Sequence, residues 1–165
     1  MTQSTFDSQD LRLLAELQSD ASLTNQALAD RTGMSPATTL RRVRRLVEEG
    51  VIERQVAILS PGRLGAGLTV IAEVTLDRQG AEHLAAFEAR AVQDEAVLQC
   101  YRVSPGPDFV LVLQVADMAA HHALVQRLFT QDANVRNVKA FFSVHRAKFE
   151  TRLPLPPAPP VRSRP

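Results

Sequence analysis

Hydrophobic and polar positions in the first 50 residues repeat at helical spacing in three short segments. Asp7 precedes leucines at this spacing through about Gln18, and Thr24 opens a second segment that ends near Thr32. The third is 35–50, where a serine suits the N-cap, a proline suits the first helical position and a glycine suits the end. The pattern predicts three short helices.

The third segment has two unlike faces. At about 100° per residue, one side collects Leu40, Val43, Leu46 and Val47, which we expect to be buried. The opposite side collects arginines, with no acid between residues 35 and 47. Guanidinium and hydroxyl groups are the donors that contact phosphates and base edges, so we interpret this helix as a DNA recognition helix. The expected DNA-binding residues are Ser35, Thr38, Thr39, Arg41, Arg42, Arg44 and Arg45. The alternative is a solvated face whose arginines pair with Glu48 and Glu49.

The second half alternates strand and helix patterns in the order β-α-β-β-α-β. The predicted strands are 68–76, 97–103, 109–115 and 138–149, and the predicted helices are 78–93 and 117–129. This order predicts a ferredoxin-like sandwich with two helices on one sheet face. Two such domains packed sheet to sheet would cover the other face, so we expect a homodimer.

Breaker residues divide the chain into four parts. Residues 1–60 are expected to form a winged helix-turn-helix domain, with 51–59 as either a two-stranded wing or a connecting strand. A linker at 61–67 leads to the ferredoxin-like domain at 68–152, and 153–165 is a Pro/Arg-rich tail expected to be extended. The fold class is therefore α+β.

Composition excludes several classes of protein. With 45% hydrophobic and 22% charged residues, the chain is expected to be a soluble globular protein. It contains no apolar run near the roughly 20 residues of a membrane span, and Met1–Asp10 does not resemble a secretory signal, so we expect a cytoplasmic protein. Residues 1–60 carry seven Lys and Arg against eight Asp and Glu, so the positive charge is local to the third helix.

Candidate catalytic and metal-binding groups are sparse. Cys100 is the only cysteine, and His121 and His122 are adjacent in a helix, so they point about 100° apart. Ser104 has no histidine or acid at motif spacing, and the Gly62-x-x-Gly65 region lacks the strand and lysine of a phosphate loop. We expect no enzyme, metal site or cofactor.

Several motifs together resemble the Lrp/AsnC (leucine-responsive and asparagine regulator, or feast/famine) family. They are Asp7-x-x-Asp10, Leu28-Ala29, Met34-Ser35-Pro36 with the arginine helix through Gly50-Val51-Ile52, Ser60-Pro61 with Leu64-Gly65, and Asp108-Phe109. The resemblance covers residues 6 to about 155. It implies a transcriptional regulator that binds double-stranded DNA and forms dimers, which often assemble into octamers. It also implies that an amino acid binds in a cleft between dimers, near the turn after the second strand.

By this resemblance the expected effector-binding residues are Val103, Ser104, Gly106, Asp108, Phe109 and Ala140. The turn departs from the family pattern because Pro105 stands at the usual glycine and lacks a backbone N–H. Two alternatives follow, an amino acid unlike the usual ones or no effector. Asp108 is either a ligand for the effector amine or a turn residue.

Two other functions share parts of the pattern. An architectural DNA-compacting protein would use the same arginine helix without an effector. Haem-pathway decarboxylases look similar, but their helix-turn-helix is degenerate, and this chain keeps its arginines.

Overall fold

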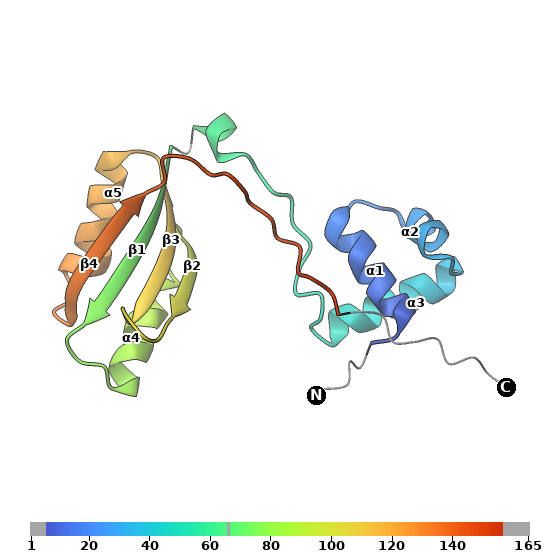
Figure 1. Cartoon of the computed structure of the whole chain (residues 1–165), viewed down its shortest axis with the longest axis horizontal. Helices are drawn as coiled ribbons and strands as arrows, with labels where there is room; N and C mark the ends of the chain where they lie inside the picture. Colours follow the sequence, from blue (N-terminus) through green and yellow to red (C-terminus); the bar gives the residue numbers. More distant parts are fainter. Residues whose placement is uncertain (1–5, 66, 157–165) are drawn as a thin grey trace. The chain divides into compact units, whose positions relative to one another are not determined.

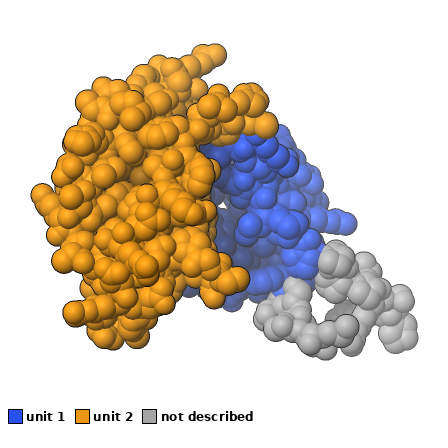
Figure 2. All heavy atoms as spheres, turned by 60° about the vertical axis from the view of Figure 1, so that its left-hand side comes forward, with its two compact units in different colours: residues 1–58, 148–165 blue, residues 59–147 orange. Residues whose placement is uncertain are grey.

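The chain divides into two units in the computed structural model, which describes residues 6–65 and 67–156 (Figure 2). The first unit spans 1–58 together with 148–165, and the second spans 59–147. The segment 148–152 therefore groups with the N-terminal unit, although the sequence places it in the C-terminal domain. Residues 157–165 of the expected tail lie outside the described part of the chain.

Three helices form the first unit, as predicted (Figure 1). They are α1 (Ser8–Ser19), α2 (Asn25–Thr32) and α3 (Pro36–Glu48). Asp7 caps α1 by accepting hydrogen bonds from the backbone N–H groups of Gln9 and Asp10, and Thr24 caps α2. Their shared core contains Leu11, Leu13, Leu14, Leu28, Ala29 and Leu46.

The buried face of α3 differs from the one expected. Leu40 and Val47 are 41% and 50% exposed, so the prediction that they are buried is wrong. The buried stripe instead runs through Thr39 and Leu46, and the half-buried Arg42 lies on it. The helix is turned in this way because a buried carboxylate of α1, described below, requires a cation on this side.

Residues 51–60 form no strand, so neither alternative expected for them occurs in the described chain. Val56 and Ile58 are largely exposed, at 64% and 62%. A 3₁₀ turn at Pro61–Leu64 follows.

The second unit is a four-stranded antiparallel sheet with two helices on one face (Figure 1). Its elements are β1 (Leu68–Leu76), α4 (Ala81–Ala91), β2 (Val97–Arg102), β3 (Phe109–Val115), α5 (Met118–Val125) and β4 (Val135–Phe142). The strand order β2-β3-β1-β4 is that of a ferredoxin-like sandwich, so the α+β class is confirmed. A π-helical turn at Gln126–Thr130 continues α5.

Alternate residues of β1 and β3 build the core against α4 and α5. Phe87 of α4 packs on Phe109 of β3, with ring centroids 4.8 Å apart. The core residues are Val70, Ala72, Val74, Leu76, Phe87, Ala91, Phe109, Leu111, Leu113, Val115, Leu124, Leu128 and Phe129.

The last strand is shorter than predicted. We expected it at 138–149, but β4 ends at Phe142, and the N–H of Ser143 makes one further bond to the carbonyl of Thr69. β4 has a partner on one side only, and β1 begins at Leu68. The described residues beyond Phe142, 143–156, accordingly form no strand.

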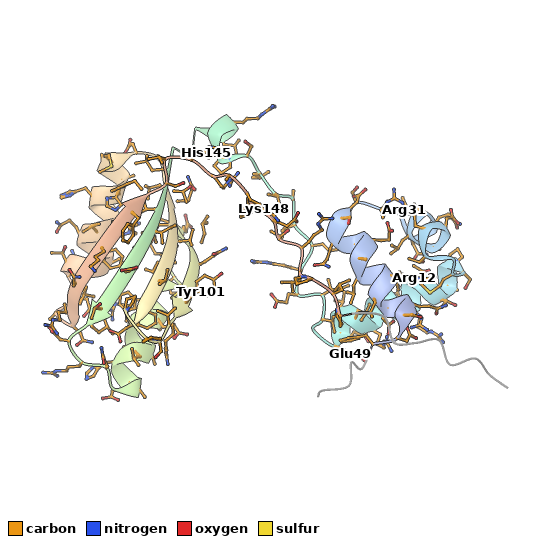
Figure 3. All side chains as sticks on the ribbon, viewed as in Figure 1. Arg12, Arg31, Glu49, Tyr101, His145 and Lys148 are labelled. Atoms are coloured by element: carbon orange, nitrogen blue, oxygen red, sulfur yellow. The ribbon has the colours of Figure 1, made fainter. Side chains whose placement is uncertain are left out.

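The sheet face away from the helices is partly apolar. Phe141, Ile71 and Val112 form one cross-strand row on this face. Val110 belongs to the next row together with Tyr101, which is labelled in Figure 3. Phe141, Ile71 and Tyr101 are 51%, 43% and 52% exposed.

Within the described residues, no helix combines the length and apolar character needed to span a membrane.

Candidate nucleic-acid interface and effector region

The start of α3 is fixed by local sequence. Gly33 adopts a left-handed conformation with φ of 70°, which suits glycine, and turns the chain between α2 and α3. The Ser35 hydroxyl accepts a hydrogen bond from the N–H of Thr38 at 3.3 Å. The amide Nδ2 of Asn25 donates to the carbonyl of Pro36 at 2.9 Å, which joins the two helices of the helix-turn-helix.

A buried carboxylate joins α1 to the arginine face of α3. The side chain of Asp10 is 2% exposed, and both its oxygens are bonded to guanidinium groups. Arg42 Nη1 donates to Asp10 Oδ1 at 2.8 Å, and Arg45 Nη2 donates to Asp10 Oδ2 at 2.6 Å. Arg42 Nη1 also lies 2.8 Å from Asp7 Oδ2. Two of the four arginines thus hold α3 against the start of α1.

The charges in this cluster stabilise one another. Burial opposes ionisation of the Asp7 carboxyl, but the backbone N–H of Asp10 and the Arg42 guanidinium outweigh it, and the pKa of Asp7 lies below its ordinary value. Burial likewise opposes the charged form of Arg42, but Asp10 and Asp7 raise the pKa of Arg42 above its ordinary value. Asp7 and Arg42 are therefore both charged near neutral pH.

Arg41 and Arg44 are exposed, and none of the ion pairs among the described residues involves them. Arg41 also lines a hollow of about 320 Å³ with Asp7, Arg42 and Arg45. Three guanidinium groups around a hollow open to solvent suit an anionic oxygen, such as that of a phosphodiester.

The structure separates the seven expected DNA-binding residues into groups. Thr39 is 0% exposed, so its expected DNA contact is wrong: its position lies on the buried stripe of α3. Ser35 and Thr38 lie in the first turn at the surface, with Ser35 exposed and Thr38 half-buried. DNA contacts by the exposed residues stay a prediction.

Sequence reasoning missed the partners of the arginines. Of the alternative pairs with Glu48 and Glu49, the described residues contain one long ion pair, in which Arg45 Nε lies 3.9 Å from Glu49 Oε1. The shorter ion pairs of Arg42 and Arg45 are with Asp7 and Asp10. The sequence signal for these pairs was the two acids Asp7 and Asp10 at the start of α1. Helix capping accounts for both acids equally well, so the sequence alone did not indicate an ion pair.

The turn between β2 and β3 holds the other group of expected residues. Ser104 and Gly106 are exposed, and Gly106 has a φ of 124°, a conformation open to glycine. Asp108 faces the end of β1: its Oδ2 accepts from the N–H of Leu76 at 2.7 Å and from Gln79 Nε2 at 3.3 Å. This geometry favours the turn alternative for Asp108.

Two of the expected effector residues do not present their side chains at that turn. The side chain of Phe109 is fully buried in the core, which leaves only its backbone for an effector, and its role in effector binding stays a prediction. Ala140 of β4 is exposed and pairs with Ala72 of β1, so β1 separates it from β3. Within one chain the structure does not bring Ala140 to the turn.

A separate hollow of about 460 Å³ lies at the opposite ends of β2 and β3, and none of the expected effector residues lines it. Arg127 donates from Nε and Nη2 to the carboxylate of Asp94 at 2.6 and 2.9 Å, and this pairing lowers the pKa of Asp94. Among the described residues, no three His, Cys, Asp or Glu side chains gather to hold a metal. His121 packs edge-on against Phe142 instead.

Both halves of the chain match known protein families. Residues 6–53 match a family described as winged helix-turn-helix DNA-binding. Residues 69–153 match one described as the Lrp/AsnC ligand binding domain.

Individual relatives agree with these matches. The Bkd operon transcriptional regulator of Pseudomonas aeruginosa is 34% identical over 150 residues, which are 91% of this chain and 98% of the relative. An AsnC family transcriptional regulator from Agrobacterium tumefaciens has a similar structure, with a TM-score of 0.84, 31% identity and coverage of 90% and 97% of the two chains. A transcriptional regulator from Neisseria meningitidis, solved in complex with L-Met, has a TM-score of 0.82, 28% identity and coverage of 91% and 97%.

Proposed function

This chain belongs to the Lrp/AsnC family of transcriptional regulators, and we propose that its homodimer reads a specific double-stranded site through α3. It is a DNA-binding regulator with a ligand-binding domain. The observation that carries the assignment of α3 is the pair Arg41 and Arg44, exposed and outside every ion pair found in the described chain. We place its action in the cytoplasm, with the chromosome.

Different residues of α3 contact the bases, contact the phosphates and position the helix. Thr38 and Arg41 lie nearest the bases, while Arg44 and the outer edge of Arg45 contact phosphates, and Ser35 supports the first turn. Arg42 fixes the helix through Asp7 and Asp10, because its guanidinium is already bonded to both carboxylates. Exposure and the existing partners of each guanidinium support the distinction between Arg42 and the two exposed arginines, Arg41 and Arg44.

The apolar sheet face supports a homodimer. Its exposed residues Ile71, Tyr101 and Phe141 would be covered by the same face of a second copy. Two symmetry-related α3 helices would then meet successive major grooves about 34 Å apart. Further association of dimers into octamers would create the clefts between dimers.

The second half supports an amino acid as effector. The matched family is described as a ligand-binding domain, and the Neisseria meningitidis relative was solved with L-Met. We place the ligand at the exposed turn, against Val103, Ser104, Gly106 and the backbone of Asp108, with Ala140 contributed from another subunit. Thermal shift with each of the twenty amino acids tests this; no shift at millimolar ligand supports an effector-independent regulator instead.

DNA titration at several salt concentrations tests the main proposal. If about three phosphates are neutralised per subunit, a dimer gives a log–log salt slope near −5, from about −0.9 per phosphate. The DNA is a fragment selected from the source genome, compared with random sequence of the same length. A slope near zero contradicts the proposal. Equal affinity for both DNAs favours the architectural alternative over the regulator.

A further inference from the structure

The chain beyond β4 returns to the DNA-binding unit and is bonded to α1. The N–H of Leu153 donates to Gln18 Oε1 at 2.7 Å, and Gln18 Nε2 donates to the carbonyl of Leu153 at 3.3 Å. These two residues are 135 positions apart in the sequence. The segment that includes Leu153 begins at Lys148, labelled in Figure 3, and groups with the first unit.

The chemistry of the two partners explains the contact. In an extended chain, the N–H and C=O of one residue point to the same side, and a primary amide carries one donor group and one acceptor. Leu153 precedes Pro154, and a residue before proline is biased toward extended conformations. Leu155 is partly buried, although a proline lies on each side of it. The Gln18 amide therefore bonds both the N–H and the C=O of one residue, Leu153, in a segment that its prolines keep extended.

Two connections of different length join the DNA-binding unit to the sheet domain when Gln18 is bonded to Leu153. Residues 49–67 connect α3 to β1 and could separate their ends by about 65 Å if fully extended. Residues 143–152 connect β4 to Leu153 and allow about 37 Å at most. The second connection is the shorter one, so it limits how far the two units can separate when Gln18 is bonded.

We propose that residues 148–156 are a releasable tether between the sheet domain and the DNA-binding unit, and that Gln18 is the positioning residue that holds it. The contact is exposed and consists of two hydrogen bonds, so it opens and closes readily. While closed, it restricts the positions of α3 relative to the sheet domain and, in a dimer, relative to the partner. The tether itself is inferred from the two hydrogen bonds between Gln18 and Leu153. Its effect on DNA binding rests in addition on the proposed function.

Trypsin reports the closed state directly in the full-length protein. Cleavage between Arg152 and Leu153 requires the backbone that Gln18 holds, whereas cleavage after Arg162 serves as a reference within the same chain. Gln18→Ala is expected to raise the rate at Arg152 relative to Arg162 about fivefold, the factor that a net hydrogen-bond contribution of about 1 kcal/mol corresponds to. Gln18→Glu keeps the acceptor and loses the donor, so its effect should be smaller. Gln9→Ala, in the same helix, is the matched control and should leave the ratio unchanged.

DNA binding tests the coupling. Gln18→Ala and a chain ending at Ala147 should bind a two-half-site DNA about fivefold more weakly and a single half-site with unchanged affinity. A chain ending at Pro156 keeps the tether and should bind both DNAs as the full chain does. An unchanged trypsin ratio in Gln18→Ala overturns the tether, and a changed ratio with unchanged two-site affinity overturns the coupling. Failure of the unaltered protein to bind either DNA contradicts the proposed function instead, and the trypsin ratio still decides whether the tether exists.

Discussion

Asp10 of α1 and Arg42 of α3 are joined by a hydrogen bond of 2.8 Å between a carboxylate that is 2% exposed and a guanidinium that is 20% exposed. The bond fixes the orientation of the recognition helix α3 on the side that packs against α1. Because Asp10 also bonds Arg45, one carboxylate determines how two of the four arginines are presented.

Asp10→Asn should therefore weaken both folding and DNA binding. Neutralising a buried carboxylate leaves two cations without their main partner, and we expect a loss of about 2 kcal/mol in the free energy of unfolding, moderated by the partial exposure of both arginines. Chemical denaturation and DNA titration measure the two effects. Asp20→Asn, in the turn after α1, is the control; equal effects from both variants would contradict the role of Asp10.

Asp7→Asn isolates the charge of the Asp7–Arg42 pair, because asparagine also caps helices. The folded pKa of Asp7 is lowered below 3.8, so its carboxylate stabilises the fold above that pH, and this stabilisation is lost as pH falls through the folded pKa. We expect Asp7→Asn to cost less than about 1 kcal/mol near neutral pH, since the Asp7 side chain is 52% exposed, and to cost progressively less as the pH falls through the folded pKa of Asp7. Denaturant unfolding at a series of pH values from 7 downward measures the trend, and a cost that does not decrease as the pH falls would contradict it.

Thr39→Val should leave DNA binding intact and raise stability. The Thr39 hydroxyl is buried and has no hydrogen-bond partner among the described residues, and valine has nearly the same shape. Removing an unsatisfied buried hydroxyl is expected to stabilise the first unit by about 1 kcal/mol. Thermal unfolding and DNA titration test this together. A large loss of DNA affinity with normal folding would return Thr39 to the DNA-binding surface.

Phe141→Glu should dissociate the dimer. The substitution places a charge on the edge strand β4, at one end of the apolar row formed with Ile71 and Val112, where a second copy would bury it. Analytical ultracentrifugation is expected to show monomers, with weaker binding to two-half-site DNA. Val92→Glu, at an exposed apolar position after α4, is the control. A Phe141→Glu protein that remains dimeric would place the interface elsewhere.

Local signals in the sequence predicted most of the fold. Asp7, Thr24, Ser35 and Asp117 each cap a helix where expected, because capping depends on neighbouring residues. The alternation of apolar and polar residues in β1 likewise predicted which of its side chains form the core, whereas β3 is apolar on both faces and its sequence did not distinguish them. These features are set within a few residues of chain.

Long-range pairing accounts for the differences. The apolar residues of α3 suggested burial of Leu40, but the position of Asp10 in another helix turned α3 toward Thr39 and Arg42. The return of Leu153 to Gln18 depends on an amide that no periodicity marks. Such contacts are visible only once the chain is folded.

In the proposed function, α3 binds DNA through its outward arginines, Arg41 and Arg44. The most direct measurement is the affinity of the double variant Arg41→Ala/Arg44→Ala for a selected site, with Arg136→Ala as a control that removes a charge from the sheet domain. We expect the double variant to keep its unfolding free energy within about 0.5 kcal/mol, to bind at least about 100-fold more weakly and to show a shallower salt slope, while the control binds normally. Normal affinity and an unchanged salt slope in the double variant would contradict the account.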